Sequence, residues 1–534
     1  MQVDVFESPE QVLQQLSENL PLLEHLDVSG TNLPGNVNVS EQSALPGWPS
    51  DRKLSFLGLM CCPSEPGFRQ NLPAHRITGD ANEEQLTAAL EAYADWRHAT
   101  GWIIRLILRN FAYMNATHRA PGHLFELLLE RMQRYLSVKY VQSDAPALLF
   151  HLLLLLDVEN ISPMRVRTLV QRLVETLERS VRAMDPAIDI VHNCFAVLSL
   201  MRTYDQIRVP SYHLLYERLL TVLLLIAQRP RSSLGNYAHV KFIALDLLRS
   251  ILLHPMHLTE SKLLLEKLDG LRVLLEILKQ VSLDEEISPI TNQCEVIAVL
   301  CWLLVSFATD ESASNCRKFI DLGGLELFIN CVKRWPDSIN AKELKRTMLL
   351  ALTNIAEMKL LRGYLKSDEL IAIFLEMLDT TDPNDNGISY NTAGVLSHML
   401  ADGEDLWHHK AGCEDADEAR LPVPLAYSRA AIGERIIAAT ERWNPDVACN
   451  TTITYTSLIP TLSLITAFDS FASQYWAAWA LNNLSLVNPD VYCPMLFREG
   501  ALDRLDTAIA DARCPDRLRH WLVLTADRIR QHIK

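Results

Sequence analysis

The chain lacks the motifs that identify most enzymes and metalloproteins. Its 11 cysteines include no CxxC pair, and its histidines show no clustered spacing, which argues against a structural zinc site. It has no nucleophile elbow, no phosphate-binding loop and no zinc-hydrolase motif. Ser306 has no base that the sequence can identify. We therefore expect a protein that is not an enzyme and that requires no cofactor and no metal.

Membrane-spanning runs and basic clusters are also missing. The Leu-rich stretch Leu148–Leu156 is too short to cross a bilayer, and Asp157 and Glu159 close it. The net charge is −15, and no Lys/Arg run exceeds two residues, so we expect neither nucleic-acid nor membrane binding. The acidic balance is typical of ordinary solubility charge. The alternative is a specific function for this charge, an acidic groove that selects cationic ligands.

The N-terminus has no apolar core of the kind that a signal peptide needs. Residues Met1–Glu7 are acidic, and the cysteine count is odd, which favours free thiols in a reducing compartment. The expected location is the cytoplasm, with the nucleus as a second compartment.

What the chain does have is a large apolar fraction arranged at helical spacing. Apolar residues make up 49% of 534 residues, enough for several domains or one long array. Positions 307, 354 and 398 end comparable apolar helices and lie 47 and 44 residues apart, a period typical of armadillo/HEAT repeats. We predict an all-α fold, an armadillo/HEAT-like superhelical solenoid with a short N-terminal leucine-rich-repeat remnant.

The first 75 residues differ from the rest. Residues 23–33 fit the leucine-rich-repeat pattern, with a strand at Leu26–Val28 after a helix that includes Val12–Leu16. Residues 54–59 could form a second strand. The predicted domains are a leucine-rich-repeat remnant and cap at 1–75 and an armadillo-like domain at 76–534.

The helical part contains one irregular segment, an acidic loop predicted at 401–424. His408, His409 and Cys413 lie in it, but a solvated loop is favoured over a metal site because nothing supplies a fixed fourth ligand. Further helices are predicted near 122–137, 143–156, 163–183, 187–202, 212–228, 238–254, 260–280, 289–308, 314–320, 323–334, 342–357, 368–378, 388–400, 425–443, 457–467, 471–486, 499–510 and 516–533.

A residue that recurs at one register of a repeat forms a row along the concave face. A carboxamide in such a row can both donate to and accept from the backbone of an extended peptide, which suits Asn354 and Asn483. Trp479 lies four residues before Asn483, where its ring could separate side-chain pockets. His398 and Tyr390 are predicted to contact the peptide in the same groove. The alternative for each Asn is a helix cap or a bond to the next loop.

Two acids occupy one register of this pattern. Asp310 and Glu357 each lie three residues beyond the row position of their own repeat. Neighbouring helix axes are about 10 Å apart, so both acids could converge on one cation, such as an α-ammonium or a Lys head. Alternatively, the segment Asp310-Glu311-Ser312 caps the helix that begins near Ser312.

Several of these stretches resemble the Zyg-eleven/Zer-one family, densely at 295–500 and loosely at 100–290. The resemblance is carried by segments 309–312, 316–320, 324–328, 354–357, 389–394 (which includes Tyr390) and 476–480, and upstream by 57–59 and 79–85. It implies a substrate receptor of cullin-RING ubiquitin ligases, with cullin and elongin partners if a further N-terminal segment is present. It also implies that an armadillo-like groove recognises proteins beginning with glycine.

The resemblance assigns Asp310, Asn354 and Glu357 to the substrate's N-terminal ammonium and first peptide unit. The family pattern has a Trp-Asn pair where this chain has Ser306-Phe307. Loss of the indole wall reshapes the pocket, and loss of the amide removes one backbone contact, which bears on glycine selectivity. The alternative function is a non-degradative armadillo scaffold or adaptor that binds an internal extended peptide.

The Asn row is interrupted on both sides of Asn354. Phe307 and His398 hold no amide, and Asp310 and Glu357 flank the same point. The pattern therefore favours a short site for one chain end over a long peptide groove.

Overall fold

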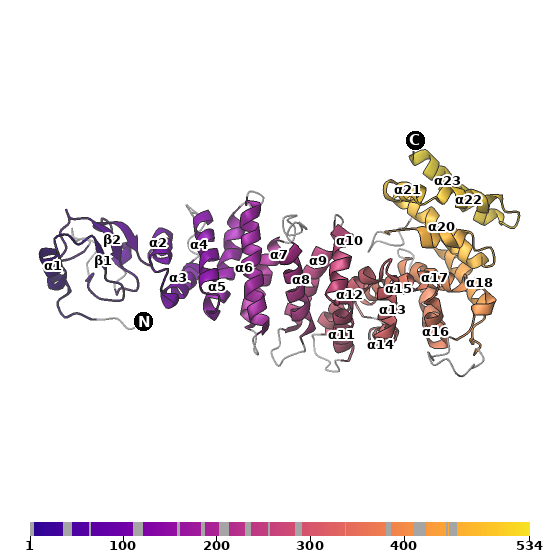
Figure 1. Cartoon of the computed structure of the whole chain (residues 1–534), viewed down its shortest axis with the longest axis horizontal. Coiled ribbons are helices and arrows are strands. Elements are labelled where there is room, and N and C mark those ends of the chain that lie inside the picture. The colour runs from indigo at the N-terminus through magenta and orange to yellow at the C-terminus, as the bar shows by residue number, and fades with distance from the viewer. Residues whose placement is uncertain are drawn as a thin grey trace. The chain divides into compact units, whose positions relative to one another are not determined.

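The computed structural model describes residues 5–35, 45–63, 66–110, 121–156, 161–182, 187–201, 213–229, 237–254, 257–283, 291–336, 338–380, 386–409, 423–444, 447 and 456–533. These residues form two compact units, which divide between Ile226 and Ala227. Figure 1 labels the helices and strands of both units.

The first unit begins with a small parallel sheet beside helix α1 (Pro9–Asn19) (Figure 1). Strands β1 (His25–Asp27), β2 (Leu54–Gly58) and β3 (Ala74–Thr78) lie in the order β1-β2-β3. The buried strand residues Leu26, Leu54 and Leu57 share a core with Leu13 of α1. The core of this part consists of Leu13, Leu26, Val28, Leu33, Leu45, Trp48, Leu54, Leu57 and Leu59.

Tyr93 connects the sheet to the first helix of the helical part, α2 (Glu83–Ala92). Its hydroxyl donates to Asp27 Oδ2 at 3.0 Å and lies 3.0 Å from Ser29 Oγ and 3.1 Å from Thr78 Oγ1. Asn82 caps α2, because its side chain accepts from the backbone N–H of Gln85.

Beyond β3, the described residues fold into helices as the apolar spacing predicts. The first unit continues with α3 (Arg97–Asn110), α4 (Pro121–Arg134), α5 (Lys139–Leu155), α6 (Pro163–Arg182) and α7 (Ile188–Met201), and α8 (His213–Gln228) reaches the division. The second unit contains α9 (Tyr237–Leu252), α10 (Leu258–Lys267), α11 (Gly270–Leu283), α12 (Thr291–Thr309), α13 (Ala313–Asp321), α14 (Gly324–Arg334), α15 (Ala341–Glu357), α16 (Asp368–Leu378), α17 (Gly387–Leu400), α18 (Arg429–Arg442), α19 (Ile459–Ile465), α20 (Phe471–Val487), α21 (Pro489–Arg498), α22 (Ala501–Ala510) and α23 (Asp516–His532).

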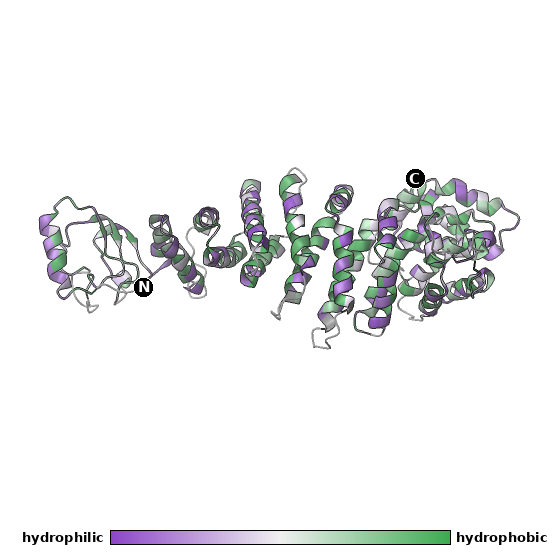
Figure 2. Cartoon of the chain, turned by 60° about the horizontal axis from the view of Figure 1, so that its bottom comes forward, coloured by the Kyte–Doolittle hydropathy of each residue, from purple (hydrophilic) through white to green (hydrophobic). Residues whose placement is uncertain are grey.

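Polar contacts between successive repeats reveal the period directly. In the first unit, Arg105 pairs with Asp144, 39 residues further along the chain. In the second unit, Arg317 donates to the Tyr364 hydroxyl, 47 residues away. Helices α12, α15, α17 and α20 pack one on the next. Figure 2 shows hydrophobic and hydrophilic residues along the same helices, as such packing requires. The predicted fold class is confirmed.

Three predictions of secondary structure are corrected. The helix expected at 260–280 is two helices, because Asp269 adopts a φ of 54° and a Cβ on Gly270 would lie 2.1 Å from Leu265. Helix α21 was not predicted, because Pro489 reads as a helix end; it occupies the first turn of α21, where the missing N–H costs nothing. Strand β3 was missed, and it crosses the domain boundary predicted after residue 75.

The structure describes both ends of the predicted acidic loop, 401–409 and 423–424. Glu404–Leu406 forms a 3₁₀ turn, and His408 pairs with Pro424 in an isolated bridge. His409 Nε2 lies 3.2 Å from Asp368 Oδ2, while Cys413 lies outside the described residues. Within the described ranges, no cluster of His, Cys, Asp and Glu could hold a metal, and no helix is long and apolar enough to span a membrane.

Candidate functional site

The ends of α12 and α15 bring acidic side chains together. These two helices pack against each other, so the residues at their C-terminal ends become neighbours. We call Asp310, Glu311, Asn354 and Glu357 the acidic site. The alternative considered for this segment, that Asp310–Ser312 caps the next helix, is confirmed for Ser312, whose side chain caps α13 by accepting from the Asn315 N–H. Asp310 itself is not the cap residue.

Asp310 is held by two internal donors. Its carboxylate forms an ion pair with Lys262 of α10, and Lys262 Nζ also donates to the Asp310 carbonyl at 3.3 Å. Thr456 Oγ1 donates to the same carboxylate, 3.2 Å from Oδ1 and 3.0 Å from Oδ2. The side chain of Asp310 keeps 25% of its surface exposed. A ligand reaching Asp310 would therefore share it with these donors or replace them.

Glu357 carries the largest electrostatic perturbation at the site. Burial raises its pKa to about 8, and the negative charges of Asp310 and Glu311 add to the effect, while Arg362 opposes it. Its carboxylate forms no hydrogen bond or ion pair with any described residue. Glu357 is thus a half-buried acid beside another acid, without a donor of its own.

A buried ion-pair network fixes the end of α15 beneath this acid. Arg362 donates to the backbone carbonyls of Ala356 and Glu357 and, through Nη1, to Asp402 Oδ1 at 2.8 Å. Lys366 Nζ donates to Asp402 Oδ2 at 2.7 Å. The Asp402 side chain is only 3% exposed. This network was not predictable from the sequence, because Asp402 lies in a segment whose composition predicts a solvated loop.

Asn354 uses its donor inside the protein. Its Nδ2 donates to Ser306 O at 2.8 Å and to Thr309 Oγ1 at 3.0 Å, so it fastens α15 to the end of α12. This is the alternative considered for the Asn row, a bond to a neighbouring helix end. The side-chain carbonyl of Asn354 has no described partner and keeps an acceptor for a ligand.

Ser306 and Phe307 are buried and leave almost no surface for a ligand to contact. The Ser306 residue is 2% exposed, and its hydroxyl donates to Leu303 O at 2.9 Å within α12. Phe307 is 5% exposed, and Lys262 Nζ lies 5.6 Å from its ring centroid. Lys262 was not predicted as a site residue, although it precedes Asp310 by 48 residues, one repeat period.

The four residues predicted to contact a peptide backbone lie inside the protein. Tyr390, His398, Trp479 and Asn483 are 1%, 0%, 2% and 2% exposed. The Trp479 ring packs 5.0 Å from that of Trp443 and 6.0 Å from that of Tyr390, measured between centroids. Their predicted role in peptide binding is corrected, because aromatic packing and burial remove these side chains from the surface.

His398 shows the effect of that burial most clearly. Neither ring nitrogen has a hydrogen-bond partner among the described residues, and burial lowers the pKa of His398 to about 3, helped by the charge of Arg362. Its ring stands edge-on to Trp476, with centroids 6.1 Å apart. His398 is a neutral core residue.

Two asparagines bind the chain's own backbone. Asn483 Nδ2 donates to Val447 O at 3.0 Å, and Asn386 Nδ2 donates to Asn444 O at 3.0 Å. The carboxamide chemistry expected of a peptide-binding row is present, but it is directed at the segment that follows α18. Asn386 gave no signal in the sequence, since it lies outside the recurring register.

Two family models match this arrangement of a leucine-rich N-terminus and helical repeats. The one described as "Protein zer-1 homolog-like, C-terminal domain" matches residues 130–530, well over half of the chain. The chain belongs to the Zer-1 family. The second, "Zer-1-like, Leucine-rich repeats", matches residues 1–62 and agrees with the parallel sheet there. The resemblance drawn from the sequence is confirmed.

Curated relatives agree along almost the whole chain. Protein zer-1 homolog of Drosophila melanogaster is 28% identical over 94% of this chain, Zyg eleven-related protein 1 of Caenorhabditis elegans 28% over 95%, and the human Protein zer-1 homolog 27% over 94%. The chain spans 64%, 53% and 61% of those proteins, respectively. A solved structure from work on a phosphorylation switch in the interaction between cadherin and beta-catenin aligns with 84% of this chain and 91% of its own, at 15% identity and a TM-score of 0.36.

Proposed function

We propose that this chain is a substrate-recognition subunit of a cullin-RING ubiquitin ligase and that its acidic site binds the free N-terminus of a protein. The ligand is a protein N-terminus or peptide, with glycine as the first residue of the family's substrates. Cullin and elongin subunits are the partners expected of the whole protein. The cytoplasm, with the nucleus as a second compartment, is the proposed location.

The unpartnered carboxylate of Glu357 beside Asp310 carries this proposal. An acid in that position needs a donor, and an α-ammonium brings three N–H groups and a positive charge. Asp310 already accepts from a cation, Lys262, which indicates that ammonium chemistry fits the site. The free side-chain carbonyl of Asn354 adds an acceptor for the first peptide N–H.

The alternative, an adaptor for internal peptides, is supported less well. It relies on a row of exposed carboxamides, but Asn483 is buried and bonded to Val447, and Asn354 uses its donor within the protein. An internal peptide also has no ammonium to offer to Glu357.

The direct test compares one peptide with a free and an acetylated N-terminus. Acetylation removes the charge and leaves Glu357 without its donor, so we expect affinity to fall at least tenfold, the usual worth of a hydrogen bond to a charged group. Asp310→Asn should weaken only the free peptide. Asp321→Asn is the matched control, since Asp321 is also ion-paired but lies on α13. Equal binding of both peptides would refute N-terminus recognition.

The ligase assignment needs a separate experiment. Proteins enriched with the full-length protein from cells should share an N-terminal residue and include cullin subunits. Recovery of neither would reject the receptor function, while recovery of substrates without cullin would support an N-terminus-binding adaptor.

A further inference from the structure

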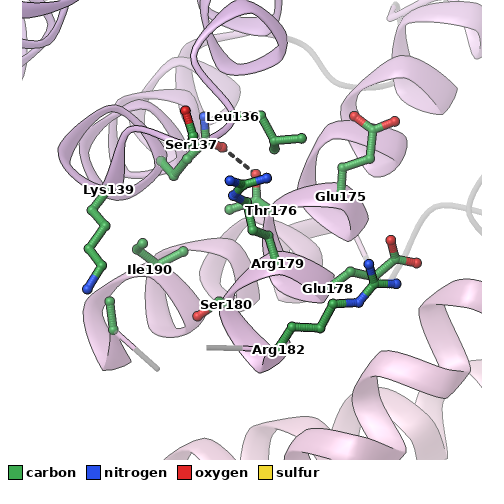
Figure 3. Close-up of a pocket in the computed structure, with 12 residues that line it drawn as sticks. Leu136, Ser137, Lys139, Glu175, Thr176, Glu178, Arg179, Ser180, Arg182 and Ile190 are labelled. Atoms are coloured by element: carbon green, nitrogen blue, oxygen red, sulfur yellow. Dashed lines mark hydrogen bonds between the residues drawn. The ribbon is translucent and has the colours of Figure 1, made fainter. Parts of the chain in front are cut away.

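A cavity of about 570 Å³ opens in the first unit, far in sequence from the acidic site. Figure 3 shows side chains from the α4–α5 turn and from α5, α6 and α7 around it. Its lining consists of Leu136, Ser137, Lys139, Gln142, Glu175, Thr176, Glu178, Arg179, Ser180, Arg182, Ala187 and Ile190. The Zer-1 resemblance assigns no role to these residues.

The two acids in this lining are already neutralised. Glu178 accepts two hydrogen bonds from Arg218, at 2.8 and 2.9 Å, and Glu175 accepts one from Arg172 at 2.7 Å. Figure 3 also shows the Arg182 guanidinium turned toward Glu178, whose pKa its charge helps to lower. The acids therefore leave little negative potential to offer a cationic ligand.

The other two cations of the lining, Lys139 and Arg179, have no acidic partner among the described residues. Neither Lys139 nor Arg179 forms an ion pair or hydrogen bond with any described residue. In a protein of net charge −15, this concentration of unpaired positive charge around a cavity is a local exception. A guanidinium and an ammonium offer donors only, so the ligand must supply acceptors and negative charge.

A buried hydroxyl points to the same kind of ligand. Ser180 is 7% exposed, lines the cavity, and has no hydrogen-bond partner for its Oγ among the residues that the structure describes. Buried polar groups are nearly always paired, so an orphan in a cavity wall indicates a missing partner. The N-terminus of α5 lies at the same wall, and its N-cap residue, Val138, provides no capping side chain. Its free backbone N–H groups and positive dipole end favour an anion.

We propose that this cavity binds a phosphate-type oxyanion, carried as a phosphate monoester on a small group, through Lys139, Arg179 and Ser180. A tetrahedral phosphate has enough acceptor oxygens for two cations, the hydroxyl and the α5 N-terminus together. The volume leaves room for the group to which the phosphate is esterified. This site is independent of N-terminus binding at the acidic site.

Isothermal titration calorimetry on the whole chain tests the proposal with O-phosphoserine, serine and inorganic phosphate at constant ionic strength. Saturable binding is expected for O-phosphoserine and none for serine. Inorganic phosphate identifies the source: equal affinity means that the oxyanion alone is recognised, and weaker affinity means that the ester group contributes. Arg179→Gln should weaken phosphoserine binding about tenfold, the usual worth of a charge-assisted hydrogen bond.

Arg109→Gln is the matched control, because Arg109 is likewise an exposed arginine in the last turn of a helix. Ser180→Ala separates binding from structure: it should weaken phosphoserine binding while leaving the melting temperature unchanged or higher, since it removes an unpaired buried hydroxyl. The proposal is overturned if the wild type shows no saturable binding, or if Arg179→Gln and Arg109→Gln have equal effects. It is likewise overturned if Ser180→Ala binds phosphoserine as the wild type does.

Discussion

Binding of a free N-terminus to the acidic site should depend on pH, because Glu357 must ionise to accept the ammonium. With a pKa of about 8, Glu357 is roughly 1% ionised at pH 6, 10% at pH 7 and 50% at pH 8. The ligand's α-amino group has an ordinary pKa of about 7.7–8.0 and loses its charge above that range. The product of the two ionised fractions predicts that affinity rises roughly twentyfold from pH 6 to 8 and falls again by about pH 9.

Fluorescence anisotropy with a glycine-initiated peptide, labelled at its C-terminus, can follow this profile. Glu357→Gln preserves the shape of the side chain but cannot ionise, so its weaker binding should be flat from pH 6 to 7. Glu326→Gln, an exposed acid on α14, is the matched control and should retain the wild-type profile. Calorimetry at pH 7 should detect release of nearly one proton on binding to the wild type and almost none to Glu357→Gln.

The folding stability of the free protein gives a second test, because it should fall over the pH range in which ligand affinity rises. Folded Glu357 holds its proton more tightly than the unfolded chain, so its contribution to stability is full below the ordinary pKa of 4.5 and is lost as the pH rises through about 8. The wild type should therefore lose stability relative to Glu357→Gln across this window. A flat affinity profile for the wild type, or a rising one for Glu357→Gln, would refute this account of the site.

Three further perturbations test the surroundings of the site. Thr456→Val removes a donor from Asp310 and should tighten peptide binding roughly twofold to tenfold, measured by anisotropy; weaker binding would show that Thr456 supports the ligand instead. Asp402→Ala leaves Arg362 and its partner lysine buried without a counter-charge, so chemical denaturation should show a loss of about 3–5 kcal/mol; a loss below about 1 kcal/mol would contradict a buried network. His398 titrates at about 3 when folded, against 6.5 as its ordinary value, so stability should fall by up to about 1.4 kcal/mol per pH unit below 6.5 in the wild type. That fall should be absent in His398→Leu, and identical acid profiles would exclude His398 as its source.

The helical period predicted the repeats well because it depends on local physics. Apolar spacing and caps such as Asn82 are encoded within a few residues, and the helices formed where that spacing was regular. The wrong helix predictions concern residues whose type suits two different local structures. Pro489 can end one helix or begin the next, and only the packing of α21 decides. The Asp269–Gly270 turn interrupts an apolar pattern that continues on both sides.

The site was predictable as a set of acids but not as a set of contacts. The spacing of Asp310 and Glu357 follows from the repeat period, and their charges do interact. Nothing in the sequence indicates that α17 and α20 turn Tyr390 and Trp479 inward, since an aromatic at a groove register also suits a core. The register of a residue determines which face of its helix it occupies. What covers that face depends on segments that come later in the chain.

The internal donors at Asp310 determine which acid should control ligand affinity. Lys262 and Thr456 already satisfy Asp310, so an incoming ammonium there exchanges one set of donors for another with little net gain. Glu357 has no such donors in the described part of the chain, so a ligand that reaches it supplies a hydrogen bond that those residues do not. At pH 8, Glu357→Gln should therefore weaken binding of a free N-terminus more than Asp310→Asn does. The reverse order would mean that Lys262 leaves Asp310 at no cost and that Asp310 is the principal anchor.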